Sequence, residues 1–168
     1  MSIPGAASPL LLATAAGGGV YDIERSLRFN SADSAYLNRT PSSAGNRRTW
    51  TWSAWVKRSK LTINDYATLF GVIAVGASDY SFLAYNANAD TLIYFESGVG
   101  SVTTSGVFRD CSAWAHICLV VDTTQSTSSN AYKLYVNGSL ASTTFSGTYT
   151  QNELTAVNSL LQHCIGSN

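Results

Sequence analysis

The acidic side chains of this sequence are few and far apart. Ten Asp and Glu residues are spread over 168 positions, and only Asp22 and Glu24 stand two positions apart, so that both would lie on one face of a strand. Hydrolysis of a glycosidic bond needs two carboxyl groups about 5–10 Å apart. Asp22 and Glu24 precede the first predicted strand and have no third acidic partner. We therefore predict no catalytic residue. A weaker alternative is a glycanase in which Glu96 faces a residue across a sheet.

Sequence motifs for nucleophilic catalysis, nucleotide binding and zinc binding are also absent. The two histidines, His116 and His163, lie in strand-like segments, and no G-x-S-x-G turn accompanies them. No phosphate-binding glycine motif is present, so nucleotide binding has no support. The cysteines Cys111, Cys118 and Cys164 show no C-x-x-C spacing, which favours buried free thiols over a zinc site or disulfides. We predict a chain without enzymatic activity and without a cofactor.

Calcium is the one metal for which the sequence offers candidate ligands. Asp33 and Asp122 each stand beside hydroxyl residues, and Ca²⁺ binds clusters of such oxygen atoms. Asp-Ser and Asp-Thr pairs are also common in ordinary turns. We predict the turn, with a metal site as the weaker alternative.

The composition is typical of a folded domain with little charge. Charged residues make up 12% of the chain, about half the usual share. Four Trp, nine Tyr and six Phe supply material for a core, and the length fits one domain. The net charge of zero gives no long-range attraction to nucleic acid or to an anionic membrane. No apolar run approaches the roughly 20 residues that span a bilayer.

The basic residues are clustered. Six of the ten lie within twenty-two positions: Arg39, Arg47, Arg48, Lys57, Arg58 and Lys60. The simpler interpretation is a solvated loop and strand end, and the alternative is a docking patch for an acidic partner.

The N-terminal region differs from the rest of the chain. The apolar run LLL at positions 10–12 suggests a signal peptide, but no Lys or Arg precedes it, so that alternative is the weaker one. Pro4, Pro9 and three consecutive glycines at 17–19 disfavour regular structure. We predict an extended arm over residues 1–19 and one domain over residues 20–168.

Short β-branched or aromatic runs alternate with Ser, Asn, Asp and Gly after residue 24, which predicts many strands. They cover residues 26–30, 35–38, 50–57, 68–73, 81–85, 91–96, 102–104, 115–122, 132–136, 141–145 and 163–166. Residues 152–161, the best helical candidate, are expected to form a loop or a single turn. Asn137-Gly138 predicts a two-residue hairpin turn, with residues 139–145 as the returning strand. Strands without intervening helices indicate antiparallel sheets packed face to face.

Two of these segments have the apolar density of central strands. Alternation places Trp50, Trp52, Ala54 and Val56 on one face of the strand at 50–57 and Thr51, Ser53 and Trp55 on the other. Residues 115–121 are apolar on both faces toward their C-terminal end, which is typical of a strand that is covered on both sides.

Four segments carry a family resemblance. They are SLRFN at 26–30 with AYL at 35–37, WSAWVK at 52–57, WAHICLVVD at 114–122 and KLYVNG at 133–138. In this order they resemble the concanavalin A-like lectin/glucanase superfamily, in its laminin-G-like branch, which implies an all-β jelly-roll sandwich. The E-x-D-x-x-E carboxylate motif of its enzymes is absent. A terminal strand expected after Ile165-Gly166 is also missing, and we predict that another subunit, a neighbouring protein or a C-terminal portion outside this chain fills that sheet edge.

A second resemblance concerns the biological source of the chain. The arm, RFNSADSAYLNRT at 28–40 and WAHICLVVDTTQS at 114–126 are similar to concanavalin-like proteins of tailed bacteriophages. This implies a non-enzymatic virion structural protein: a fibre, an appendage or a capsid decoration. Other virion proteins would contact the arm and the open sheet edge, and a homo-oligomer is expected by analogy with fibres. If the source is not a phage, an extracellular location is expected.

Glycan binding would need exposed aromatic rings with polar groups around them. Trp55, His116 and Tyr135 are predicted to share the more polar face of their strands and are our candidate ligand-binding residues. The alternative is that the tryptophans at 55 and 114 belong to the core, as the resemblance implies for their positions. A stand-alone carbohydrate-binding module is the alternative function.

Overall fold

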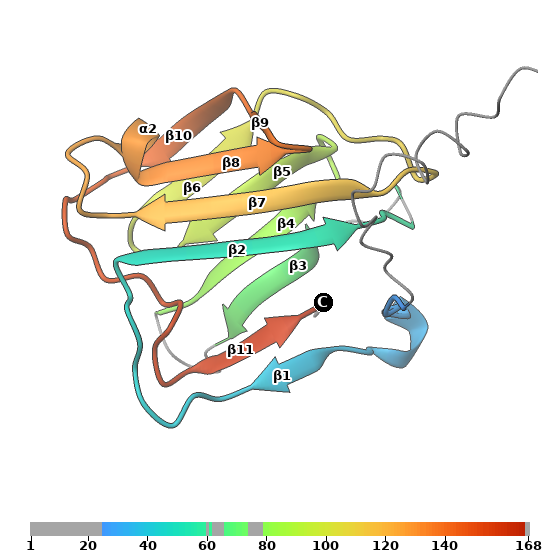
Figure 1. Cartoon of the computed structure of the whole chain (residues 1–168), viewed down its shortest axis with the longest axis horizontal. Coiled ribbons are helices and arrows are strands. Elements are labelled where there is room, and N and C mark those ends of the chain that lie inside the picture. The colour runs from blue at the N-terminus through green and yellow to red at the C-terminus, as the bar shows by residue number, and fades with distance from the viewer. Residues whose placement is uncertain (1–24, 60, 62–65, 74–78, 167–168) are drawn as a thin grey trace, which may run out of the picture.

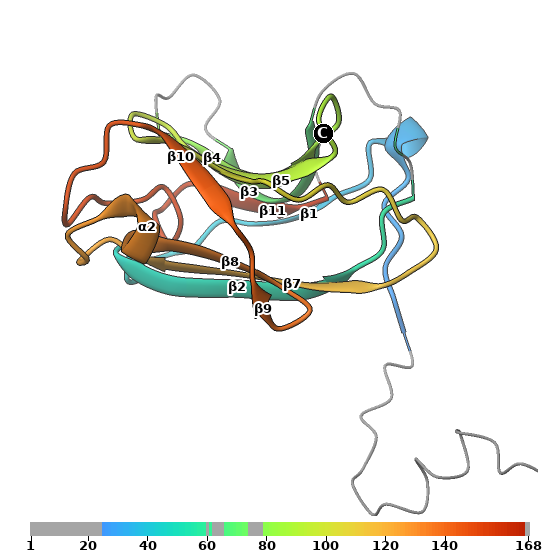
Figure 2. The same cartoon turned by 90° about the horizontal axis from the view of Figure 1, so that it is seen from above.

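The computed structural model of the chain describes residues 25–59, 61, 66–73 and 79–166. These residues form two antiparallel sheets that pack face to face (Figure 1, Figure 2). The larger sheet has seven strands, in the spatial order β1 (Leu37–Arg39), β11 (Gln162–Ile165), β3 (Tyr66–Ile73), β4 (Ser81–Asn86), β5 (Thr91–Glu96), β6 (Gly100–Thr104) and β10 (Thr143–Gly147). The smaller sheet has four strands, in the order β2 (Thr49–Val56), β7 (Ala115–Asp122), β8 (Tyr132–Val136) and β9 (Ser139–Leu140). The predicted two-sheet antiparallel sandwich is confirmed.

Helical structure is minor in the described residues. It consists of the 3-10 turn η1 (Ser31–Asp33) and the four-residue helix α2 (Ser128–Ala131). Within this part of the chain, no helix has the length and apolar character required to cross a membrane. Residues 152–161 form turns and bends, as predicted. The predicted arm over residues 1–19 lies outside the described residues.

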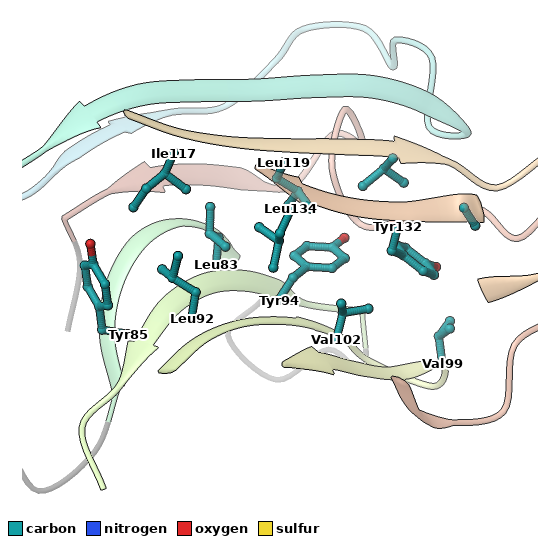
Figure 3. Close-up of a cluster of buried hydrophobic side chains, with 12 residues drawn as sticks. Leu83, Tyr85, Leu92, Tyr94, Val99, Val102, Ile117, Leu119, Tyr132 and Leu134 are labelled. Carbon is teal, nitrogen blue, oxygen red and sulfur yellow. The ribbon is translucent and has the colours of Figure 1, made fainter. Parts of the chain in front are cut away.

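The core lies between the sheets. Leu83 and Leu92 from the larger sheet meet Leu119 and Leu134 from the smaller one, and all four are fully buried. Figure 3 shows these side chains packed around Tyr94. The predicted alternation of β2 is confirmed, because Trp50, Trp52, Ala54 and Val56 are half-buried while Thr49, Thr51, Ser53 and Trp55 are exposed.

The hairpin predicted at Asn137-Gly138 is present. Both residues have positive φ angles, 50° and 80°, as a two-residue turn of this kind requires. The strand that follows it differs from the prediction. Only β9 pairs with β8, and the chain then crosses to the larger sheet as β10, where Phe145 stacks on Tyr132 at a ring-centroid distance of 6.1 Å. The crossing closes this end of the sandwich and sets the half-buried Phe145 against the buried ring of Tyr132, which a continuous strand would leave apart.

The prediction of a strand over residues 26–30 is wrong. These residues have no strand structure, and Leu27 is 70% exposed. A strand needs a neighbour for its backbone N–H and C=O groups, and the structure describes none beside this segment. The predicted strand at 35–38 is present but shifted to β1.

The two sheets have different widths. β2 forms one edge of the smaller sheet, and Figure 1 shows β11 and β1 of the larger sheet beyond that edge. In the part of the chain that the structure describes, β2 is therefore an edge strand, and the occupant expected at an open sheet edge stays a prediction.

Candidate functional site

The predicted ligand-binding residues lie on the outer face of the smaller sheet. Trp55 on β2 and His116 on β7 are directly opposite each other, with ring centroids 5.3 Å apart. Tyr135 on β8 is opposite Cys118, the next residue of β7 that points the same way as His116. The structure thus brings Trp55, His116 and Tyr135 onto one surface.

The alternative that the two tryptophans belong to the core is wrong. Trp55 is 53% exposed and Trp114 is 47% exposed. The expectation that β7 is covered on both faces is also wrong, because Cys118 and Val120 on its outer face are only half-buried. The four-stranded sheet therefore presents an accessible face with aromatic and polar side chains.

A second aromatic surface lies on the outer face of the larger sheet. We call it the aromatic row: Tyr66 on β3, Phe82 on β4, Phe95 on β5 and Tyr80 just before β4. Successive ring centroids in this order are 5.0, 5.4 and 5.3 Å apart. Tyr66 and Tyr80, the two ends, are 39% and 40% exposed. Four rings thus form a continuous apolar strip with a phenol at each end.

Hydroxyl groups border the aromatic row. Ser101 on β6 lies opposite Phe95, and Ser146 on β10 lies opposite Ser101. Thr103 and Thr144 form the next such pair along the same two strands. We call these four residues the hydroxyl strip. Figure 2 shows the seven-stranded sheet curved so that its outer face is the concave one.

The aromatic row was missed in the sequence for a physical reason. The strands that carry it, YATLFGVI, SFLAYN and TLIYFE, are apolar on both faces, which is also typical of strands that are covered on both sides. Only the register, which sets Phe82 opposite Phe95, aligns the rings. The sequence contains only a weak signal for an outer aromatic face: in β4, the core residues Leu83 and Tyr85 alternate with Phe82 and Ala84, and all four are apolar or aromatic.

Glu96, the residue of the glycanase alternative, is held in structural contacts. Glu96, 4% exposed, accepts hydrogen bonds from the Tyr94 hydroxyl at 2.5 Å and from the Ala156 N–H at 2.7 Å. Its neighbours across the sheet are Ser81 and Gly100, so the pairing required by the glycanase alternative does not exist. The acidic pair Asp22 and Glu24 lies outside the described residues.

The two carboxylates considered for calcium form turns. Asp33 accepts a hydrogen bond of 2.6 Å from the Asn30 amide. Asp122 accepts from Thr124 and Gln125, and these bonds hold its pKa below the ordinary value. Over the described ranges, no three His, Cys, Asp or Glu side chains are grouped closely enough to hold a metal ion.

The basic cluster is mostly used within the fold. Arg47 donates to the Thr155 carbonyl at 2.6 Å and Arg48 to the Asn152 carbonyl at 2.9 Å. Arg58, 6% exposed, forms a salt bridge of 2.8 Å with Asp90 and lies over the Tyr85 ring. Arg39 instead lines a groove formed by residues of β1, β11 and β3 and of the adjoining loops. Lys60 lies outside the described residues.

A match to a family profile identifies the superfamily of this chain. Residues 29–167 match the profile of the concanavalin A-like lectin/glucanases superfamily. The chain belongs to the concanavalin A-like lectin/glucanase superfamily. Its jelly-roll sandwich is accordingly the expected architecture of the superfamily, and the first of the two resemblances seen in the sequence is confirmed.

Solved structures share the superfamily fold at low identity. Domains LG4-5 of the mouse laminin alpha1 chain match with a TM-score of 0.51 and 11% identity, over 78% of this chain and 31% of that one. The carbohydrate-binding module CBM66 from Bacillus subtilis matches with a TM-score of 0.42 and 10% identity, over 79% of this chain and 74% of that one. This member of the superfamily thus spans about a third of the laminin structure. None of the curated proteins matches its sequence.

Proposed function

We propose that this chain is a non-catalytic glycan-binding module and that the aromatic row is its main contact surface. The observation that carries the proposal is the strip of four adjacent rings, open at both ends and bordered by the hydroxyl strip. The apolar face of a pyranose can pack on aromatic rings, while its hydroxyl groups pair with serine, threonine and tyrosine hydroxyls. Membership of a lectin/glucanase superfamily supports lectin-like binding.

The absence of catalysis belongs to the same proposal. Glycoside hydrolysis needs two carboxyl groups facing one substrate bond. Among the described residues, Asp79 precedes Tyr80 at one end of the aromatic row, but no second carboxyl group faces it there, because Glu96, on the same strand as Phe95, points to the opposite side of the sheet. The row is therefore suited to holding a sugar chain without cutting it.

The surface around Trp55, His116 and Tyr135 is the second candidate. It is favoured by the exposure of the Trp55 ring, 53%, and by its contact with an imidazole that can donate a hydrogen bond. The two surfaces lie on opposite sides of the sandwich, so variants of one leave the other unchanged.

The biological setting that we propose is a virion, with the chain as a fibre, appendage or capsid decoration. Residues 1–19 would anchor it to neighbouring virion proteins, and glycans of the host would meet the exposed sheets. The similarity of the arm and of residues 28–40 to phage proteins supports this setting, as does the low charge of the chain. Deletion of residues 1–19 should abolish incorporation into particles, and unchanged incorporation would exclude the arm as the anchor.

A glycan array with the full chain tests the binding function, followed by titration of the best ligand into matched variants. Tyr66→Ala and Tyr80→Ala remove exposed rings of the aromatic row and should each weaken binding about tenfold, equivalent to about 1.4 kcal/mol. Trp55→Ala and Tyr135→Ala serve as the matched controls. Loss of binding only in these controls would assign the ligand to the second surface. Absence of any glycan ligand would overturn the proposal.

A further inference from the structure

A pocket lies between the two sheets at one end of the sandwich. Its volume is about 330 Å³, which is within the range of sites that hold one small molecule. Val56 at the end of β2, Val136 at the end of β8 and Tyr85 near the end of β4 line it. Figure 1 shows the ends of β2 and β8 at the same end of the molecule. The loop between β6 and β7 supplies most of the remaining wall.

Tyr85 brings a buried hydroxyl group to this pocket. The residue is 3% exposed, and among the described residues none donates a hydrogen bond to its hydroxyl or accepts one from it. Figure 3 shows this hydroxyl at the edge of the buried cluster, directed toward the layer of the smaller sheet. Burial raises the pKa of Tyr85, so the group keeps its proton and can donate. A buried hydroxyl without a partner disfavours folding, and a bound ligand would supply the partner.

Contacts within the fold hold the Tyr85 ring in place. The Arg58 guanidinium lies 5.0 Å from the centre of this ring and donates to the Phe108 carbonyl at 2.7 Å. The centroid of the Phe108 ring is 6.3 Å from that of Tyr85. Arg58 and Arg109 both form salt bridges of 2.8 Å with Asp90. These arginines are therefore used within the fold, and they give the pocket a preformed wall.

Two further polar side chains of the pocket can reach a ligand. The N–H and the hydroxyl of Ser112 both donate to Oδ1 of Asp110, so Oδ2 can accept from a ligand. The same bonds hold the pKa of Asp110 below its ordinary value, which keeps it charged at neutral pH. Oδ1 of Asn137 accepts from the His116 N–H at 2.8 Å, which orients the amide and leaves its NH₂ group as a donor.

The rest of the lining is aromatic or aliphatic. Trp114 is 47% exposed, and Val56, Val107 and Val136 lie around the same space. A pyranose ring has an apolar C–H face that packs on an indole, and hydroxyl groups that pair with a phenol, an amide and a carboxylate. An anionic ligand is disfavoured, because Arg58 and Arg109, the arginines of the described lining, are already paired with Asp90.

We propose that this pocket binds one neutral pyranose ring. Trp114 packs against the face of the sugar, while Tyr85, Asp110 and Asn137 form hydrogen bonds with its hydroxyl groups. The pocket shares no residue with the aromatic row or with the surface around Trp55, so its binding does not depend on theirs.

Two-dimensional ¹H–¹⁵N NMR of the full chain, titrated with glucose, galactose, mannose and N-acetylglucosamine, tests the proposal. At least one sugar should shift the Trp114 indole N–H and the Asn137 side-chain amide, with a Kd on the order of 1 mM. Tyr85→Phe removes one hydrogen bond and should weaken this binding about fivefold. Because the hydroxyl has no partner in the described fold, urea unfolding should show this variant to be at least as stable as the wild type.

Tyr132→Phe is the matched control. Tyr132 is 2% exposed and its hydroxyl also has no partner among the described residues, but it does not line the pocket. This variant should bind the sugar as the wild type does. Equal affinity of the Tyr85→Phe variant and the wild type would overturn the proposal.

The remaining outcomes also contradict the pocket as a sugar site. Shifts confined to the Trp55 indole, or binding lost in Tyr66→Ala, would assign the sugar to one of the two outer surfaces. Absence of shifts with all the sugars, or shifts with the cation choline alone, would show that the pocket holds no neutral sugar. If a glycan array finds no ligand for the aromatic row while these sugars still shift Trp114, the function proposed for the row fails and the pocket remains.

Discussion

The Tyr94 hydroxyl donates a hydrogen bond of 2.5 Å to Oε2 of Glu96, two residues further along β5. Both side chains are buried between the sheets, and the other oxygen of Glu96 accepts from the Ala156 N–H. Burial raises the pKa of Glu96 to about 7, since the loss of hydration disfavours the carboxylate more than the two hydrogen bonds favour it. One carboxyl group thus ties the loop at residues 148–161 to the larger sheet and titrates near neutral pH.

Stability should therefore fall as the pH rises toward neutrality. The pKa of Glu96 is higher in the folded chain than its ordinary value of 4.5, so the folded state retains the proton longer than the unfolded state. This contribution is fully present below about pH 4.5 and is lost as the pH rises through about 7. The loss is on the order of 3 kcal/mol. Urea unfolding at pH 5, 6, 7 and 8 measures it.

Glu96→Gln isolates this effect. Burial lowers the pKa of His163, so that histidine changes stability in the opposite sense over the same pH range. The substitution leaves the histidine in place and should remove only the fall that Glu96 causes. Identical pH profiles for the wild type and the Gln variant would show that Glu96 does not titrate in this window. Glu153→Gln, in the same loop as Ala156, is the matched control.

Two glycines on neighbouring strands should tolerate no side chain. Gly100 on β6 and Gly147 on β10 lie opposite each other, with φ angles of 138° and 141°. A Cβ on Gly100 would lie 2.2 Å from the Ser146 carbonyl oxygen, and one on Gly147 would lie 2.2 Å from that of Val99. Because backbone atoms cannot move aside as a side chain can, Gly100→Ala should lower the free energy of unfolding by about 3 kcal/mol.

Gly98→Ala separates backbone strain from steric overlap. Gly98 has a φ of 77°, but no atom lies within 4 Å of a Cβ built there. Only the unfavourable φ remains, so a loss of about 1 kcal/mol is expected. Thermal or urea unfolding of both variants measures the difference, and equal losses would exclude the overlap as the cause.

The three thiols should differ in reactivity. Cys164 is 1% exposed, and burial raises its pKa, so little reactive thiolate forms. Cys111 and Cys118 are half-buried. A thiol-specific chromogenic reagent should modify two cysteines in the native chain and all three in denaturant. Reaction of Cys164 at the rate of the other two in native buffer would contradict its burial.

The sequence predicted those parts of the fold that local patterns determine. Trp50 and Trp52 alternate with Thr51 and Ser53, and this period of two defines the buried face of β2 without any knowledge of its neighbours. The Asn137-Gly138 turn depends only on the φ angles that these two residues readily adopt. Both predictions are confirmed because neither needs a long-range contact.

Features that depend on distant segments were not predictable. The aromatic row requires the register of β3, β4 and β5, and β3 contains an irregularity between Thr68 and Phe70 that no local pattern indicates. The environment of Glu96 includes the Ala156 N–H, sixty positions away in the sequence. Residues 26–30 have the composition of a strand but lack the neighbour that a strand needs.

The hydroxyl of Thr155 should contribute more to stability than its methyl group. This residue is fully buried, and its Oγ1 accepts from the Trp50 indole N–H at 2.9 Å and donates to the Arg47 carbonyl at 2.7 Å. In Thr155→Val the Arg47 carbonyl still accepts the N–H of residue 155, but the indole N–H loses its acceptor. A buried donor without a partner costs about 1–3 kcal/mol. Thr155→Ser keeps the hydroxyl and should lose less than about 1 kcal/mol. Urea unfolding followed by tryptophan fluorescence compares the two variants, and a Val variant as stable as the Ser variant would show that the Trp50 bond does not stabilise the fold.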